Sequence, residues 1–524
     1  MWRAAIGAGQ RRGGVRRSAS GWGRAVRCVP GAIGPEAGGG GGRSVVQEIV
    51  SWDARELWRA VADRRVSCVE VMEAYLEHIG RIGPHVNAVV GLQAPETSLR
   101  LARERDEQLR RGEPPGPLHG FPHAVKDLTE AEGLPWTEGS PLYRDRVGKQ
   151  DALLVKRVKA AGAVVIGKTN TPEFGLGSQT YNEVWGAAGN AYDPSRTAGG
   201  SSGGAAAALA LRMLPVADGS DYMGSLRNPA AFNNVFGMRP SWGLVPSPGF
   251  TAQLGTAGPM ARTTADLARL LSVMAGPDGS APLAAGQAQG ERFAESLERP
   301  EGAFRGTRIA WTGDWDGYLA TEPGVLEVCR SSFAAFEALG CEVTDARPDF
   351  APEEIWRTFL TWRWWANLER HELYADPATR ARMKPEAVWE IECGLPLGAL
   401  DIAEAAVARD RWYEALRGFL DDYDYVLAPA AQVFPFDRET HWPERVGGRE
   451  MDTYHRWMET VVPWTLAGVP AIGMPAGFGP EGLPMGVQLI GRHGADLELL
   501  RLAHAYERET GWVRRVRPAL LERS

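Results

Sequence analysis

Cysteine is scarce in this sequence of 524 residues. The five cysteines are odd in number and widely spaced, at Cys28, Cys68, Cys329, Cys341 and Cys393. No two of them form a C-x-x-C pair, so the sequence indicates neither a disulfide framework nor a zinc site. Because disulfides persist in oxidising compartments, this use of cysteine predicts a reducing one, and we expect the protein in the cytoplasm.

Long apolar runs and metal-binding patterns are also missing. The sequence has no apolar run of about 18 residues, so we predict no transmembrane helix and no membrane partner. The nine histidines show no H-E-x-x-H or similar spacing, so no metal and no cofactor are predicted. A net charge of −7 argues against a general nucleic-acid-binding surface.

Residues 1–43 have little of what a folded core needs. The segment is rich in glycine and arginine, and Glu36 is its only acidic residue. This composition predicts disorder over residues 1–45, ahead of an ordered domain at 46–516. The twin arginines are not followed by an apolar region, so a secretory signal is not expected. An organellar transit peptide stays open, but an idle tail or a start included too far upstream is favoured.

Serine and glycine gather in two clusters between Asp193 and Arg239. The first is Gly199–Gly204 (GGSSGG), and the second is Gly219–Ser225 (GSDYMGS). Glycines beside a serine let backbone N–H groups approach a ligand closely. The run Ala205–Leu211 predicts a helix that aims its positive end at the first cluster. The stretch therefore suits a site that stabilises an oxyanion or binds an anion.

These clusters resemble the hallmark of the amidase signature family: G-G-S-S-G-G, an alanine-rich helix, then D-x-x-G-S-x-R-x-P-A. Upstream, Pro117–Asp127 (PLHGFPHAVKD) is similar to the family's lysine-bearing segment. That family hydrolyses carboxamides with a Ser–cis-Ser–Lys triad. Matched residue by residue, the resemblance implies a catalytic lysine at Lys126, a cis-serine at Ser201 and the nucleophile at Ser225. The three motifs stand in the family's order and spacing.

The resemblance also implies an oxyanion site made by backbone N–H groups. They map onto Tyr222, Met223, Gly224 and the nucleophile Ser225. Met223 stands where the family usually has glycine. A backbone N–H is still present, and we expect the methionine side chain to narrow or reshape the substrate pocket.

Other motif residues are interpreted as supports of the site. Asp221 and Arg227 match family positions and are expected to hold the loop, although an ordinary turn carboxylate explains Asp221 equally well. Ser202 is expected to hydrogen-bond within the site or to cap the helix that follows. His119 and His123 flank the lysine and are interpreted as supporting or packing residues rather than ligands.

Strands and helices alternate along the chain, which predicts an α/β fold with a mixed sheet. The resemblance implies the family's α/β/α layered catalytic domain. Several segments are predicted individually: a capping box at Ser67–Glu70, a helix end at Arg81–Pro84, a helix over Leu99–Arg111 capped by Ser98, a strand over Phe121–Lys126 and a helix over Gly324–Leu339.

The function expected from these motifs is amide hydrolysis. An amide needs an activated nucleophile, an oxyanion site and a proton for the leaving amine, and a buried neutral lysine can act as the base. We expect an amidase acting on linear or aryl carboxamides, through an acyl-enzyme on Ser225 with a relay through Ser201 and Lys126. Its partner would be a small-molecule amide, and a homodimer is left open.

Three other interpretations compete with this one. Gly199–Gly203 fits the G-x-S-x-G elbow of α/β-hydrolases, but Asp193–Thr197 does not look like the strand that must precede it. The A-type subunit of a glutamine-dependent amidotransferase, which works in a tRNA-linked complex, shares the fold and triad. The stretch Trp242–Gly249 lacks the tyrosine-bearing loop typical of such subunits. An inactive binding protein is disfavoured because all three triad positions are filled.

The tryptophans invite a further question, since 19 are present. Five of them cluster at Trp356, Trp362, Trp364, Trp365 and Trp389. Core packing is the favoured interpretation of the cluster, and an aromatic wall over the active site is the alternative.

Overall fold

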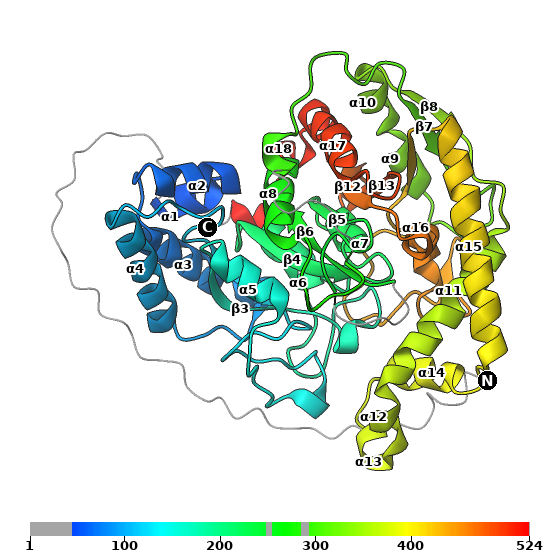
Figure 1. Cartoon of the computed structure of the whole chain (residues 1–524), viewed down its shortest axis with the longest axis horizontal. Coiled ribbons are helices and arrows are strands. Elements are labelled where there is room, and N and C mark those ends of the chain that lie inside the picture. The colour runs from blue at the N-terminus through cyan, green and yellow to red at the C-terminus, as the bar shows by residue number, and fades with distance from the viewer. Residues whose placement is uncertain (1–44, 248–253, 285–292, 523–524) are drawn as a thin grey trace. The chain divides into compact units, whose positions relative to one another are not determined.

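Runs of small and β-branched residues build one large sheet (Figure 1). Its eight strands follow the order β4-β6-β5-β12-β13-β9-β7-β8. The pairs from β4 to β9 are antiparallel, and β7 is parallel to both β9 and β8. The predicted α/β fold with a mixed sheet is therefore confirmed. The strands are β4 Val216–Asp221, β5 Phe236–Arg239, β6 Thr256–Ala261, β7 Arg308–Trp311, β8 Glu342–Asp345, β9 Tyr425–Pro429, β12 Ala471–Phe478 and β13 Pro484–Ile490.

A second sheet of three strands lies beside the first. Its order is β1-β3-β2, with β2 parallel and β1 antiparallel to β3. The strands are β1 Val89–Val90, β2 Pro122–Lys126 and β3 Val164–Thr169. Edge strand β2 runs next to β4, the edge strand of the large sheet. A short hairpin is formed by β10 Arg445–Val446 and β11 Arg449–Glu450.

This computed structural model describes residues 45–247, 254–284 and 293–522. The disorder predicted for residues 1–45 falls, except for Val45, outside the described residues, and the domain boundaries stay a prediction. Among the residues described, no helix is both long and apolar enough to cross a membrane.

The first helices show how local sequence decides where a helix begins and ends. They are α1 Val45–Ser51, α2 Ala54–Ala62, α3 Cys68–Val86 and α4 Pro95–Arg110. The capping box of Ser67 and Glu70 is present, as predicted. The predicted end of α3 at Pro84 is wrong: the helix continues to the buried Val86 and ends where Asn87 adopts a left-handed conformation.

The predicted cap of α4 is also wrong. The helix begins at Pro95, four residues before the predicted start, and Ser98 is buried within its first turn. Proline suits the first helical position because its fixed φ is already helical and its missing N–H would have no partner there. Ser98 instead accepts a hydrogen bond from the Gln93 side chain at 3.0 Å.

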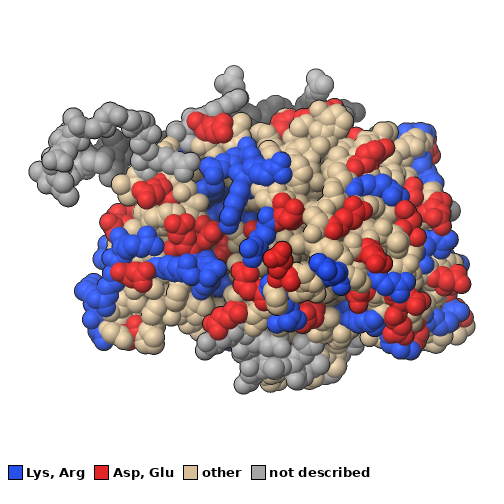
Figure 2. All heavy atoms as spheres, turned by 90° about the horizontal axis from the view of Figure 1, so that it is seen from above, with Lys and Arg blue, Asp and Glu red and all other residues tan. Residues whose placement is uncertain are grey.

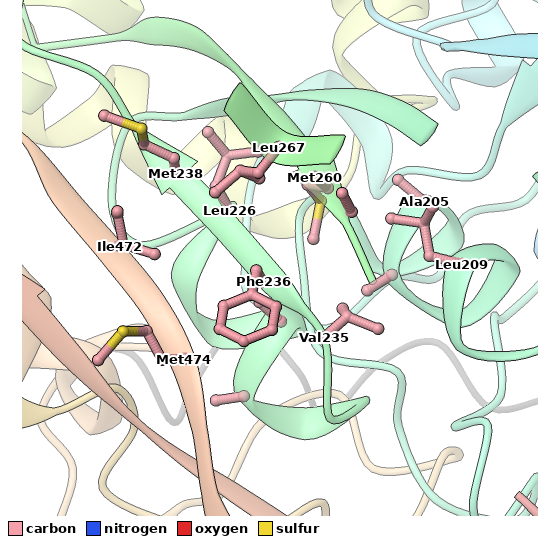
Figure 3. Close-up of a cluster of buried hydrophobic side chains, with 14 of the residues drawn as sticks. Ala205, Leu209, Leu226, Val235, Phe236, Met238, Met260, Leu267, Ile472 and Met474 are labelled. Atoms are coloured by element: carbon pink, nitrogen blue, oxygen red, sulfur yellow. The ribbon is translucent and has the colours of Figure 1, made fainter. Parts of the chain in front are cut away.

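The core lies between the large sheet and the short helices α6 Gly203–Ala210, α7 Arg227–Phe232 and α8 Thr264–Met274. Helix α5 Leu153–Ala160 packs against α8, and its Val155 lies in a separate cluster with Val125 and Val165 of the small sheet. Figure 3 shows Phe236 and Met238 of β5 beside Ile472 and Met474 of β12. All eight residues of α6 are buried, so this helix of small side chains is a central part of the core rather than a surface layer.

The remaining helices follow β7. The helix predicted over Gly324–Leu339 is two helices, because the buried Ser332 turns its hydroxyl back to the Cys329 carbonyl at 2.6 Å and competes with the helical ladder. Helix α11 packs along α15 (Figure 1). The helices are α9 Val325–Arg330, α10 Phe333–Ala338, α11 Pro352–Asn367, α12 His371–Ala375, α13 Pro377–Arg380, α14 Pro385–Gly394, α15 Ala399–Asp422, α16 Val462–Ala467, α17 Asp496–Thr510 and α18 Trp512–Arg515. Short 3-10 helices lie at Pro141–Tyr143, Glu173–Gly175, Phe293–Glu295, Leu368–Arg370, Arg456–Val461 and Ala519–Leu521.

Candidate active site

A buried lysine stands at the end of β2, surrounded by hydroxyl groups. The Nζ of the buried Lys126 lies within hydrogen-bonding distance of the Oγ atoms of Ser201 at 2.7 Å, Ser202 at 2.9 Å and Ser220 at 3.1 Å. A neutral amine has two N–H groups and one lone pair. Surrounded by three hydroxyls, it can donate to two and accept a proton from the third.

The environment of Lys126 favours this neutral form. Burial lowers the pKa of Lys126 to about 7, while the carboxylates of Asp218 and Asp221 act in the opposite direction. A charged ammonium loses its hydration in such a place, which disfavours the protonated state. Near neutral pH a substantial fraction of the amine is therefore able to accept a proton.

The two serine clusters are joined by a main-chain hydrogen bond. Ser201 precedes α6, and its peptide bond with Gly200 is cis, as the resemblance implied. Ser225 follows β4, and its carbonyl accepts a hydrogen bond from the N–H of Ser202 at 3.2 Å. Both Ser201 and Ser225 are buried, with 3% and 6% of their surface exposed. The fold thus brings together all three residues of the predicted triad.

Of the four predicted oxyanion donors, one is engaged elsewhere. The N–H of Gly224 donates to the Asp221 carboxylate at 2.8 Å. Among the residues that the structure describes, the N–H groups of Tyr222, Met223 and Ser225 have no hydrogen-bond acceptor. Three N–H groups of one loop are therefore available to an oxyanion.

Asp221 organises the loop that carries the nucleophile. Its carboxylate accepts hydrogen bonds from Arg227 at 2.9 Å and 3.0 Å and from the N–H of Leu226 at 3.2 Å. Burial by itself would raise the pKa of Asp221, but Arg227 and Arg239 outweigh it and hold the pKa at about 2. Asp221 is thus ionised at neutral pH, and its hydrogen bonds to Leu226 and Arg227 hold the loop.

Met223 does not shape the substrate pocket as the sequence led us to expect. Its side chain is 5% exposed and belongs to the main hydrophobic core. The neighbouring Tyr222 lines the cavity instead, with its ring edge-to-face against Phe359 at 6.3 Å between centroids. In the tight turn before Gly224, consecutive side chains point to different sides, so residue 223 faces inward and residue 222 faces the cavity.

A cavity of about 610 Å³ opens beside Ser201. One group of lining residues is apolar or aromatic: Leu128, Trp136, Phe174, Leu176, Trp242 and Leu254. A second group comes from α11 and the turn after it: Arg363, Ala366, Asn367 and Arg370. The spacing of these four places them on one face of a helix. The cavity therefore combines apolar walls with a polar one, in which Arg363 is paired with Glu390 at 2.5 Å and Arg370 with Glu369 at 2.7 Å.

None of the five clustered tryptophans lines this cavity in the part of the chain that the structure describes. Trp356 is 2% exposed, and Trp362 and Trp365 contact each other edge-to-face. The packing interpretation is confirmed. The aromatic residues of the cavity, Trp136 and Trp242, come from other segments.

The two histidines beside the lysine segment have different partners. His119 shares a hydrogen bond with the Arg105 carbonyl at 3.0 Å, and burial lowers its pKa. His123 is fully buried and contacts the Asp218 carboxylate at 2.9 Å. Both are thus held inside the protein, as expected of supporting residues.

Some site residues were missed by the sequence motifs. Ser220 lies in the second serine cluster, but only the fold brings its hydroxyl to Lys126. Asp218 stands one residue before that cluster and looks like an ordinary strand residue. Arg363 and Asn367 lie far along the chain from the triad, and no local pattern marks them as cavity residues.

Comparisons with known proteins show which family the chain resembles. The family model described as Amidase matches residues 70–500. An acylamidase of Rhodococcus erythropolis is 33% identical over 89% of this chain and 98% of its own. The A-type subunit of the Glutamyl-tRNA(Gln) amidotransferase of Chloroflexus aurantiacus is 34% identical over 86% of this chain and 95% of its own. The crystal structure of a bacterial aryl acylamidase of the amidase signature family superposes with a TM-score of 0.82 at 26% identity, covering 91% of this chain and 98% of that one.

Proposed function

The chain belongs to the amidase signature family and is an amide-hydrolysing enzyme, and from this premise we propose that it acts through an acyl-enzyme on Ser225. In this proposal Ser201 and Lys126 form the proton relay. The reaction splits the C–N bond of a carboxamide and yields a carboxylic acid and ammonia or an amine.

One observation carries the proposal. The buried Nζ of Lys126 lies 2.7 Å from the Oγ of Ser201, in a place that favours the neutral amine. A serine hydroxyl is a weak nucleophile until a base takes its proton. The contact supplies that base, and the bond from Ser202 to the Ser225 carbonyl keeps the nucleophile beside it.

In the proposed reaction, protons and bonds are conserved at each step. Lys126 accepts the proton of Ser201, Ser201 accepts the proton of Ser225, and the Oγ of Ser225 attacks the carbonyl carbon. As the tetrahedral intermediate collapses, the C–N bond breaks and the relay returns the proton to the leaving nitrogen. Water, deprotonated by the same relay, then cleaves the ester, which releases the acid and restores the Ser225 hydroxyl.

The loop before the nucleophile would stabilise the negative oxygen formed in each half of the reaction. Backbone N–H groups that are already oriented stabilise such a charge without having to reorganise. The available N–H groups of Tyr222, Met223 and Ser225 support this role. Substrate choice follows from the cavity, whose apolar and aromatic walls favour amides with an apolar or aryl group.

The relatives support a second candidate. Several of them are A-type subunits of amidotransferases named for Glutamyl-tRNA(Gln). Against this candidate stands the stretch Trp242–Gly249, which does not resemble the tyrosine-bearing loop typical of such subunits. Amide hydrolysis by the isolated chain, without a partner protein, would favour the first candidate.

The proposal includes a reducing, cytoplasmic location. It is supported by the cysteines at positions 68, 329, 341 and 393, all of which are free. The proposed chemistry does not depend on the location, because the relay uses no thiol.

The direct test is the nucleophile. Ser225→Ala should abolish hydrolysis of aryl acylamides and abolish labelling by a fluorophosphonate, which forms a covalent bond to an activated serine oxygen and releases fluoride. The loss of one hydroxyl should leave the melting temperature close to that of the wild type. The matched control is Ser272→Ala, in α8, which should keep both activities.

Peptide mapping decides between the serines. We expect the label on Ser225 in the wild type. Ser201→Ala should retain slow labelling, because the relay is lost but the nucleophile remains. A label on Ser201 would contradict the proposal.

A further inference from the structure

A buried histidine–aspartate pair lies directly behind the lysine. The Nε2 of His123 and the Oδ1 of Asp218 are 2.9 Å apart, and the side chains are 0% and 1% exposed. The second carboxylate oxygen accepts a hydrogen bond from the backbone N–H of Lys126 at 3.3 Å. The amidase motifs do not include this pair, and the reaction described above does not use it.

The pair joins strands of two separate sheets, which the side chains of Lys126 and Ser220 also connect at 3.1 Å. Lys126 ends β2, the edge strand of the small sheet, whereas Asp218 lies in β4, the edge strand of the large sheet. An edge strand presents N–H groups that need a partner. The Asp218 carboxylate satisfies one of them at Lys126 and, through His123, holds β2 at a second point three residues earlier. Lys126 and the Ser220–Ser225 segment after Asp218 are thereby kept in register.

We propose that Asp218, oriented by His123, is a positioning residue that places the Lys126 amine against its serines and governs how readily the amine gives up its proton. The inference rests on the function proposed above, in which Lys126 is the base.

The charges around Lys126 make Asp218 the main carboxylate acting on it. Asp218 opposes the effect of burial on the pKa of Lys126 more strongly than Asp221 does. Asp221 is already paired with Arg227 at 2.9 Å. Asp218 also opposes the effect of burial on the pKa of the buried Lys168 of β3. On β2, His123 is the titratable group that contacts Asp218. Removing the charge of Asp218 while keeping its shape should therefore make the Lys126 ammonium a stronger acid.

The experiment measures the rate of fluorophosphonate labelling against pH for the full chain. In the wild type the rate should rise with pH as Lys126 loses its proton. Asp218→Asn should move the midpoint of this rise down by about one pH unit, since a nearby opposite charge shifts a pKa by about one to three units. Asp218→Glu keeps the charge and should stay near the wild-type midpoint. The matched control is Asp266→Asn, which removes another buried carboxylate, in α8, and should leave the midpoint unchanged.

A second pair of variants keeps the test decisive if Asp218→Asn does not fold. His123→Leu removes the donor that orients the carboxylate and should move the midpoint, while His123→Gln provides an N–H donor and should restore it. An unchanged midpoint in Asp218→Asn, or in His123→Leu where the first does not fold, overturns the inference. If the wild type shows no rise with pH at all, the proposed role of Lys126 fails instead, so the two failures can be told apart.

Discussion

At the scale of single residues, the site depends on Lys126, whose positive charge is costly in free energy at a buried position. A lysine ammonium removed from water loses its hydration, and the three hydroxyls around Lys126 only partly replace it. Serine hydroxyls can both donate and accept, so they remain partners of the amine in either protonation state. This versatility distinguishes the site from an ordinary buried ion pair, in which a carboxylate would lock the lysine in its charged form.

Lys126 can be tested by its protonation. Lys126→Met removes the base and should lower kcat/KM by about 10² to 10⁴-fold, the usual contribution of a proton-transferring group. Lys126→Arg should not restore the rate, because a guanidinium stays charged at any usable pH. In the wild type the rate should increase with pH and level off above about 7. Full activity of Lys126→Arg would reduce Lys126 to a positive charge near the loop.

At the scale of elements, sequence motifs predicted the site where it is built from contiguous segments. The geometry of the cluster at Gly199–Gly204 follows from its glycine spacing and from the helix that starts there. The position of Lys126 follows from the end of its strand. The wall from α11 could not be predicted, because Arg363 reaches the cavity only through the packing of α11 on α14 and α15. The break at Ser332 was missed for a related reason: only its burial makes its hydroxyl seek a backbone carbonyl.

The contact between α17 and α8 yields a prediction on stability. Glu507 of α17 accepts hydrogen bonds from the N–H of Thr264 at 2.7 Å and from its hydroxyl at 2.5 Å. Burial raises the pKa of Glu507 to about 7, although the bonds from Thr264 lower it. The folded state then holds more protons than the unfolded state between 4.5, the ordinary value, and about 7. The contribution of Glu507 to stability should therefore fall as pH rises through this window and stay constant above it.

Glu507→Gln removes this titration. The free energy of unfolding of the wild type, relative to the variant, should decrease between about pH 5 and about pH 8. Urea denaturation at both pH values measures the difference. Glu509→Gln, at an exposed position of the same helix, is the control and should show a smaller change. A difference that is equal at both pH values would contradict the raised pKa of Glu507.

At the scale of the whole molecule, charges of both signs lie on the face shown in Figure 2. Lys and Arg residues alternate with Asp and Glu over this face. The net charge of −7 repels a phosphate backbone at long range, and nucleic-acid-binding proteins usually present a basic stripe. The charges on this face and the net charge therefore favour the candidate function that acts on small substrates.

The charge of the protein distinguishes the two candidate functions experimentally. We expect no binding of bulk tRNA to the isolated chain in a gel-shift assay at low or physiological salt, and no tRNA in the copurified material. Hydrolysis of a small aryl acylamide should proceed under the same conditions. A band shift that weakens as salt increases would instead favour the tRNA-linked amidotransferase.

The buried helix α6 has a consequence for how this enzyme can change. Every side chain of α6 is inside the core, and a methyl group added at Gly204 would collide with the backbone of Asn170. The helix beside the triad therefore tolerates almost no larger side chains. The wall from α11 lines the cavity, where a changed side chain alters the contacts with a ligand, although Asn367 and Arg370 also hydrogen-bond to each other at 3.2 Å. Laboratory evolution should therefore collect its accepted mutations at Ala366, Asn367 and Arg370, so that new substrates are acquired while the chemistry is inherited unchanged.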